Sequence, residues 1–300
     1  MKHRATWTAA AVILLATFAV GQAPDQYLDV FVVQVRPEKR ADFDAISKKM
    51  VAANRQNKGD EWLAMETVYG TMNRVTLVSM RQSYGDTEKA GDAFYAALQK
   101  SMGKAGADKA FQEFNTCLET SWSELRKRRW DLSSNAPADG AALAKLTGES
   151  RWLRTSIIHV KPGRGPELEE LLKEVKAARE KNSPDVTTLV SQTVAGREGT
   201  IYYVTTFEKS MAGFDSIAPL PKVLGEEAYA HYLKTGSEIV ENTETVINRF
   251  LPEISNPSAE VMAAAPDYWS PKPVVGKAAS PKKSVVNASE TAKEKEEVKK

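Results

Sequence analysis

The chain has 300 residues, of which 27% are charged, and its formal net charge is +2. This balance excludes attraction to nucleic acid through net charge, and the length is enough for two ordinary domains. The single cysteine, Cys117, excludes an intrachain disulfide, and we expect it to pack as a small apolar residue.

The N-terminal segment 1–21 has the features of a signal peptide. A positively charged start precedes an apolar run over 9–20, and Ala19 and Gly21 suit the −3 and −1 positions of a cleavage site. The run is shorter than the ~20 residues of a membrane-spanning helix. We therefore expect cleavage before Gln22 and an exported protein, periplasmic or secreted, without stable membrane insertion.

The next part of the chain predicts one folding unit. Phe43, Ile46 and Met50 share one face of an amphipathic helix, and Gly70 and Asn73 suit the positive φ angles of a tight hairpin. The elements predicted in order are a strand over 27–36, a helix over 38–56, strands over 61–69 and 74–80, helical segments over 86–100 and 107–118, and a closing strand over 124–132.

The same pattern occurs a second time. Corresponding positions lie about 125 residues apart at the start and about 120 at the end, too long for a solenoid repeat and typical of a duplicated domain. The pairs are Pro37 with Pro162, Gly70 with Gly196, and Arg129 with Arg249. We expect a first unit over 24–133, a linker over 134–150 and a second unit over 151–255.

Both units have the order β-α-β-β-α-β, which is the ferredoxin-like pattern. Such a unit forms an antiparallel sheet with helices on one face, so its other face needs a second sheet to cover it. The predicted fold class is therefore α+β, with two tandem ferredoxin-like units packed sheet to sheet as an intramolecular α/β barrel.

The segments 35–43 and 160–168 share a short motif: a strand end, Arg or Lys, Pro, and an acidic residue followed by Phe or Leu. This motif resembles the opening of dimeric α/β-barrel proteins, including antibiotic-biosynthesis-monooxygenase-like and stress-responsive domains. The resemblance implies the fold more than an activity, because this group includes oxygenases, isomerases, haem enzymes and proteins with no assigned reaction.

The C-terminal segment 256–300 is rich in Pro, Ala and Lys and poor in large apolar residues. Such a composition predicts disorder. Lysines outnumber glutamates at its end, so the segment is either a solubilising tail or a weak contact to anionic envelope polymers.

Strand alternation suggests where ligand-binding residues lie. Phe31, Val33 and Val35 are expected to face the helices, which places Gln34 and its counterpart His159 between the two sheets. Three further candidates for the same space come from the other strands: Glu66, its counterpart Gln192, and Tyr203. A satisfied interior histidine remains an alternative for His159, an exposed strand position for Glu66, and a core position for Tyr203.

Two other features predict structure more than chemistry. The basic run 126–129 is expected to be a solvated edge strand. His231 lies on a predicted helix, opposite its apolar stripe, where a side chain could not reach an interior haem.

No nucleotide-binding, metal-binding or hydrolase motif occurs in the sequence. The sequence therefore favours an exported small-ligand-binding or non-catalytic module without a cofactor and without nucleic-acid partners. The alternatives are a cofactor-independent monooxygenase or isomerase that uses His159 and Glu66 in the inter-sheet cavity and, third, a haem protein that uses His231.

Overall fold

The computed structural model describes residues 26–270. The predicted signal peptide and residues 271–300 of the predicted tail lie outside the described residues. The first half of the described chain contains, in order, β1 (Tyr27–Val35), the 3-10 turn η1 (Pro37–Lys39), α1 (Arg40–Asn57), β2 (Leu63–Tyr69), β3 (Arg74–Arg81), α2 (Tyr84–Thr116) and β4 (Leu118–Arg128).

The second half repeats this order with additions. Helix α3 (Gly140–Glu149) precedes it, and three short elements follow it: η3 (Pro252–Ile254), α7 (Ala259–Ala264) and α8 (Pro266–Trp269). Its own elements are β5 (Trp152–Val160), α4 (Gly165–Asn182), β6 (Thr188–Ala195), β7 (Thr200–Glu208), η2 (Met211–Ser216), α5 (Leu220–Leu224), α6 (Glu226–Ile239) and β8 (Val240–Phe250).

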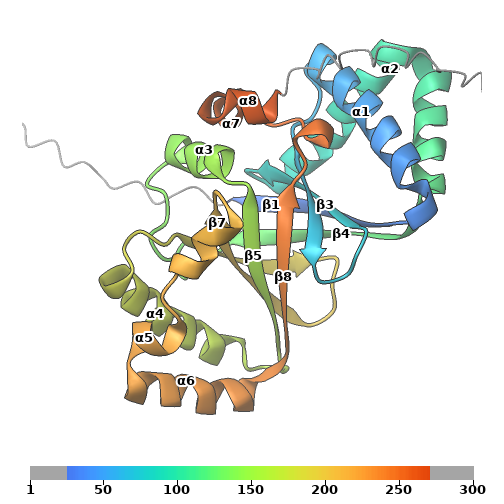
Figure 1. Cartoon of the computed structure of the whole chain (residues 1–300). Coiled ribbons are helices and arrows are strands. Elements are labelled where there is room, and N and C mark those ends of the chain that lie inside the picture. The colour runs from blue at the N-terminus through green and yellow to red at the C-terminus, as the bar shows by residue number, and fades with distance from the viewer. Residues whose placement is uncertain (1–25, 271–300) are drawn as a thin grey trace, which may run out of the picture.

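The eight strands form one closed antiparallel barrel in the order β1-β3-β2-β8-β5-β7-β6-β4. Each half contributes four neighbouring strands, and the halves join at two seams, β2–β8 and β4–β6. In Figure 1 the strands β1 and β4 run across β5 and β8, with α1 and α2 on one side of the barrel and α4 to α6 on the other. The predicted α+β class and barrel are therefore present, and no strand of the barrel is left with a free edge.

Alternation along β1 divides the barrel wall into an outer and an inner face. Val33 and Val35 are fully buried against side chains of α1 and α2, including Phe43. Val30 and Val32 belong to a separate cluster inside the barrel. This is the division that the sequence predicts, with the more apolar face toward the helices.

The predicted hairpins are also present. β2 pairs with β3, and the turn between them has positive φ angles at Gly70 (134°) and Asn73 (58°), a region that glycine and asparagine tolerate. The two predicted helical segments before β4 appear as one long element, α2, which is interrupted at Gly103 with φ 72° and ψ 166°.

Two predictions about connecting segments are wrong. The expected linker contains helix α3, and the expected disordered tail is folded up to Ser270. Helices α3, α7 and α8 pack together as a cap against one end of the barrel, with Val261 and Trp269 fully buried and the Trp269 indole donating to the Gly148 carbonyl at 2.9 Å. A few large apolar residues suffice because the barrel end offers Phe250 and Leu153 as partners.

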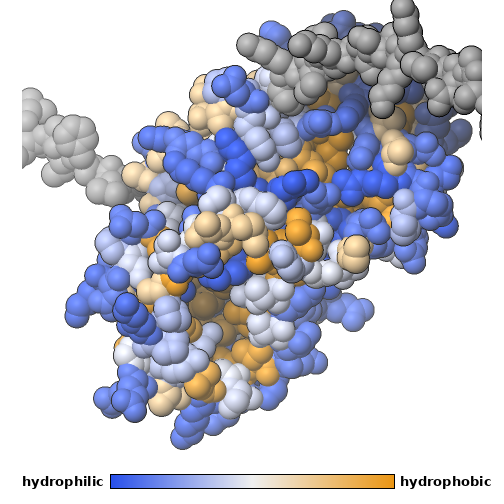
Figure 2. Space-filling model, viewed as in Figure 1, coloured by the Kyte–Doolittle hydropathy of each residue, from blue (hydrophilic) through white to orange (hydrophobic). Residues whose placement is uncertain are grey.

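The outer surface carries mostly polar side chains on the face in view, with smaller apolar patches among them (Figure 2). Within residues 26–270, no helix combines the length and the apolar character that crossing a bilayer would require.

Replacing Trp269 with Ala should lower the free energy of unfolding by about 3–5 kcal/mol, because it leaves a cavity between the cap and the barrel. Chemical denaturation monitored by far-UV circular dichroism measures this. The control Met72→Ala, at a site 75% exposed, should change stability by less than about 0.5 kcal/mol. A similar small effect for both variants would show that the cap does not stabilise the barrel.

Candidate functional site

The barrel contains a partly open cavity of about 610 Å³, lined by inward side chains of both halves, by residues of the cap and by residues of α2. Volumes of roughly 300–1,000 Å³ are typical of small-molecule sites. Its two opposite sides differ in character. The β4 wall carries Trp122, Glu124, Arg126 and Arg128. The opposite wall, on β2 and β8, carries four apolar residues, Leu63, Met65, Val246 and Phe250, together with Thr67, Glu244 and Asn248.

Glu124 is the centre of the polar contacts in the cavity, and only 1% of its side chain is exposed. Tyr203 donates its hydroxyl hydrogen to Glu124 Oε2 at 2.7 Å, and Arg126 donates from Nη2 to Oε1. Thr193 makes a longer contact to Oε2 at 3.4 Å. The carboxylate therefore ties together strands β4, β6 and β7 from inside.

Burial alone would raise the pKa of Glu124, but the charge and hydrogen bond of Arg126 and the hydrogen bond from Tyr203 outweigh it, so the pKa is lowered. Burial raises the pKa of Tyr203. The charge of Arg126 lowers this pKa, whereas the charge of Glu124 and its hydrogen bond raise it, and the net result is a raised pKa. At neutral pH the pair is therefore a carboxylate and a neutral phenol.

Arginine side chains surround the aromatic groups of the cavity. The Arg126 guanidinium carbon lies 3.4 Å from the Tyr203 ring centroid. The guanidinium carbons of Arg74 and Arg197 lie 5.4 and 5.5 Å from the Trp122 ring centroid. These are distances at which cation–π attraction operates, and they present arginine N–H groups at the cavity wall.

The structure brings together two of the five predicted site residues. His159 and Tyr203 both line the cavity. Gln34 is on the inward face of β1 but near the end of the strand, where its side-chain amide donates to the Met72 carbonyl at 2.6 Å. It is not among the residues that line the cavity.

The other two candidates, Glu66 and Gln192, lie on the outer side of the barrel, at equivalent places on the two seams. Glu66 accepts from Arg249 across the β2–β8 seam at 2.8 Å and from Arg40 on α1 at 3.0 Å. Glu66 is therefore the shared acidic partner of two arginines outside the cavity. It cannot exchange a proton with His159, which lies on the cavity wall.

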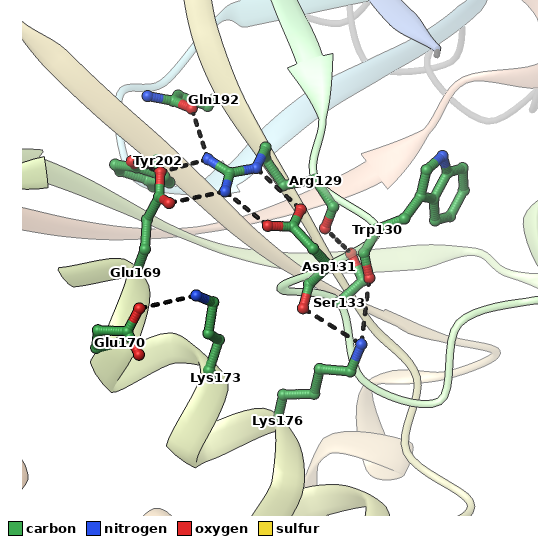
Figure 3. Close-up of polar contacts among 10 residues, drawn as sticks. All are labelled: Arg129, Trp130, Asp131, Ser133, Glu169, Glu170, Lys173, Lys176, Gln192 and Tyr202. Atoms are coloured by element: carbon green, nitrogen blue, oxygen red, sulfur yellow. Dashed lines mark hydrogen bonds and ion pairs between the residues drawn. The ribbon is translucent and has the colours of Figure 1, made fainter. Parts of the chain in front are cut away.

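Gln192 takes part in a matching network at the β4–β6 seam (Figure 3). Its side-chain oxygen accepts from Arg129 Nη1 at 2.9 Å, while the same guanidinium pairs with Asp131 and with Glu169 of α4. Tyr202 also donates to Glu169, at 2.6 Å. Figure 3 shows Arg129 at the centre of this group. Its contacts join the end of β4, in the first half, to β6 and α4 in the second half.

The prediction of a solvated edge strand at 126–129 is wrong. β4 is paired on both sides, with β1 and with β6, and alternation turns Arg126 and Arg128 into the barrel. The sequence alone does not show this, because both alternating sets of the strand contain basic residues, Arg126 with Arg128 and Lys127 with Arg129.

His231 lies on helix α6, with 56% of its side chain exposed and Nε2 4.0 Å from Glu174 Oε1. It does not line the cavity, so it does not fit the role of an axial haem ligand inside the barrel. Among residues 26–270, no group of three or more His, Cys, Asp or Glu side chains is arranged to hold a metal ion.

No family model and no curated protein sequence matches this chain. Solved structures with a similar arrangement include an anthrone oxidase-like protein, with 11% identity over 77% of this chain and 93% of that chain and a TM-score of 0.48. A chlorite dismutase from Candidatus Nitrospira defluvii has 11% identity, with coverage of 76% and 92% and a TM-score of 0.44.

A haem-binding protein from Thermus thermophilus has 13% identity, with coverage of 78% and 94% and a TM-score of 0.43. At such low identities and scores, nothing about the activity of this chain follows from the similarity.

Replacing Glu124 with Gln should lower the free energy of unfolding at pH 7 by about 3 kcal/mol, because it leaves Arg126 buried without its ionic partner. The lowered pKa of Glu124 means that its contribution is complete above the ordinary carboxyl pKa of about 4.3 and is lost as the pH falls through the lower folded value.

The stability difference between wild type and Glu124→Gln should therefore be constant from about pH 5 to 7 and shrink below about pH 4. Urea denaturation across this range measures it. Glu244→Gln is the matched control, since Glu244 also lines the cavity but has no hydrogen bond or ion pair among the described contacts. Equal effects of the two substitutions at pH 7 would contradict the role assigned to Glu124.

Proposed function

We propose that this protein binds a small organic molecule inside the barrel. The observation that carries the proposal is a cavity of about 610 Å³ that is lined by apolar side chains and by convergent polar groups. A barrel that served only as a structural element would fill this space with side chains, since protein interiors are packed about as densely as organic crystals.

The state of the central carboxylate favours binding over acid–base catalysis. Glu124 is ionised and engaged by Arg126 and Tyr203. A general acid or base works best with a pKa near the operating pH, whereas the pKa of Glu124 is moved away from neutrality. Its bonds instead hold the β4 wall in a fixed arrangement before a ligand arrives.

A cofactor-independent monooxygenase or isomerase is the second candidate, and the observation that favours it is the position of His159 on the cavity wall. Imidazole is the side chain most often used for proton transfer near neutral pH. In this function His159 would act without Glu66. Mass spectrometry of bound ligands after incubation in air would detect oxygenation or isomerisation, and a ligand recovered unchanged speaks for binding alone.

We also propose that the two halves descend from one duplicated ferredoxin-like unit of the dimeric α/β-barrel group. The equal element order, the equal strand connections and the seam arginines Arg129 and Arg249 support this proposal. In this view the chain contains in one polypeptide what such a group assembles from two subunits.

The neutral dye N-phenyl-1-naphthylamine should bind with a stoichiometry of one per chain and a rise in fluorescence. Thr76→Trp should weaken this binding at least tenfold, about 1.4 kcal/mol, because Thr76 lines the cavity and an indole would occupy the space. Thr243→Trp, at an exposed strand position, is the matched control and should bind like wild type. Unchanged binding in Thr76→Trp, or no binding of any apolar probe to wild type, would contradict a cavity site.

Export is proposed on the N-terminal sequence alone. Expression of the full chain in a bacterium with a periplasm should give a mature protein that begins near Gln22, because small residues follow the short apolar run. Intact-mass analysis of the periplasmic fraction tests this. A mass that includes residues 1–21, or a protein confined to the cytoplasm, would contradict the proposal.

A further inference from the structure

We propose that the ligand of the barrel cavity is an amphipathic organic anion whose carboxylate, or similar acidic group, binds at Arg128 of the β4 wall. This inference rests on the proposed ligand-binding function and names the chemical class of the ligand.

Arg128 is the group that the protein itself does not neutralise. It is 8% exposed and lines the cavity, and its Nε–H has no hydrogen-bond acceptor among the described residues. No described carboxylate forms an ion pair with it, and its aromatic neighbour is the Trp130 ring, 5.6 Å from the guanidinium carbon. A buried guanidinium in this condition is unfavourable unless an anion joins it.

The surroundings of Arg128 increase its demand for an anion. Burial, and after it the like charge of Arg126, lower the pKa of Arg128 to about 10. The group is still protonated at neutral pH. A ligand carboxylate beside it would relieve both the desolvation and the repulsion, and arginine binds carboxylates through two parallel hydrogen bonds.

The charges of the whole cavity point the same way. Six cationic side chains line it against four acidic ones, and the one acidic side chain of the β4 wall, Glu124, is already bound to Arg126 and Tyr203. Arg126 and Arg74 each also have a buried Nε–H without an acceptor among the described residues, and so does the Trp122 indole. These N–H groups can donate hydrogen bonds to a negatively charged ligand, whereas a cationic ligand would be repelled by the excess of positive charge.

The opposite wall sets the rest of the ligand. β2 and β8 lie across the barrel from β4 and β6 in the strand order. They present Thr67, Glu244 and Asn248 to the cavity and also Val246 and an apolar cluster of Leu63, Met65 and Phe250, which supplies the surface for an apolar ligand body. The ligand that matches both walls has an acidic group at one end and an apolar or aromatic body at the other. Trp122 and Tyr203 also line the cavity.

Isothermal titration with naphthalene-2-carboxylate and with its neutral analogue naphthalene-2-carboxamide tests this inference. Wild type should bind the carboxylate at least tenfold more tightly than the carboxamide. Arg128→Met keeps most of the aliphatic stem and removes the charge, so it should bind the carboxylate at least tenfold more weakly and the carboxamide within about twofold of wild type.

Arg164→Met is the matched control, because it removes one cation from the exposed start of α4 and leaves the cavity unchanged. It should bind both compounds like wild type. Arg128→Met should also melt no lower than wild type without ligand, since it removes a buried charge that has no described partner. Arg128→Lys provides a second variant, which keeps the charge and should keep a preference for the carboxylate.

The outcomes separate the two levels of the proposal. Equal affinity of wild type for carboxylate and carboxamide, or an unchanged preference in Arg128→Met, overturns the anion inference and leaves the cavity site in place. Failure of wild type to bind either compound, together with failure of the neutral dye, overturns the binding function as well. A preference lost equally in Arg164→Met would show attraction by net charge only and would overturn the assignment to Arg128.

Discussion

Closure of the barrel at its two seams is the constraint on which the rest of the structure depends. Each half has helices on one face of its sheet only, so the other face must be covered. The edge strands must also be paired, and these are β2 and β4 in the first half and β6 and β8 in the second. The β2–β8 and β4–β6 pairings satisfy the backbone groups of these edges and enclose the uncovered faces. The interior of an eight-stranded barrel can be filled by side chains or can hold one small ligand, and in this barrel a cavity of about 610 Å³ is left.

The seams are reinforced from outside in the same way at both places. Arg249 reaches across one seam to Glu66, and Arg129 reaches across the other to Gln192. Arg129 also donates hydrogen bonds to Asp131 and Glu169. The hydrogen bonds to Glu169 and Asp131 raise the pKa of its guanidinium. These contacts fix how the halves meet, and thereby they fix which inward side chains face one another across the cavity.

The sequence predicts the frame of this molecule well because the frame depends on local patterns. Alternation in β1 separates Val33 from Val32, and the positive φ angles of Gly70 and Asn73 follow from residue type. The folding of the cap could not be foreseen, since the segment around Trp269 is rich in alanine and proline with few large apolar residues, and its partners on α3 and β5 are distant in sequence. Strand parity predicts that His159 faces the cavity, whereas it does not settle which face Glu66 takes. Tyr203 was a candidate only because aromatic residues on strands can line such a space.

The charged residues of β4 show why the basic run was misinterpreted. A run of four basic residues is usually solvated, and only the pairing of β4 with β6 shows that alternate members point inward. β8 holds the place of β4 in the second half, yet its inward face carries no arginine and consists of Glu244, Val246, Asn248 and Phe250. Asn248 is satisfied by Thr67 at 2.9 Å, whereas Arg128 has no such partner among the described residues. The two halves share one fold but differ in their inward side chains. On β8 the hydrogen bond of Asn248 is stabilising, whereas on β4 the burial of the charged Arg128 is unfavourable. The charge of Arg128 destabilises the fold without a ligand, and an anionic ligand would neutralise it. In the proposed complex the acidic group of the ligand therefore binds β4, and its apolar body contacts apolar residues of β2 and β8.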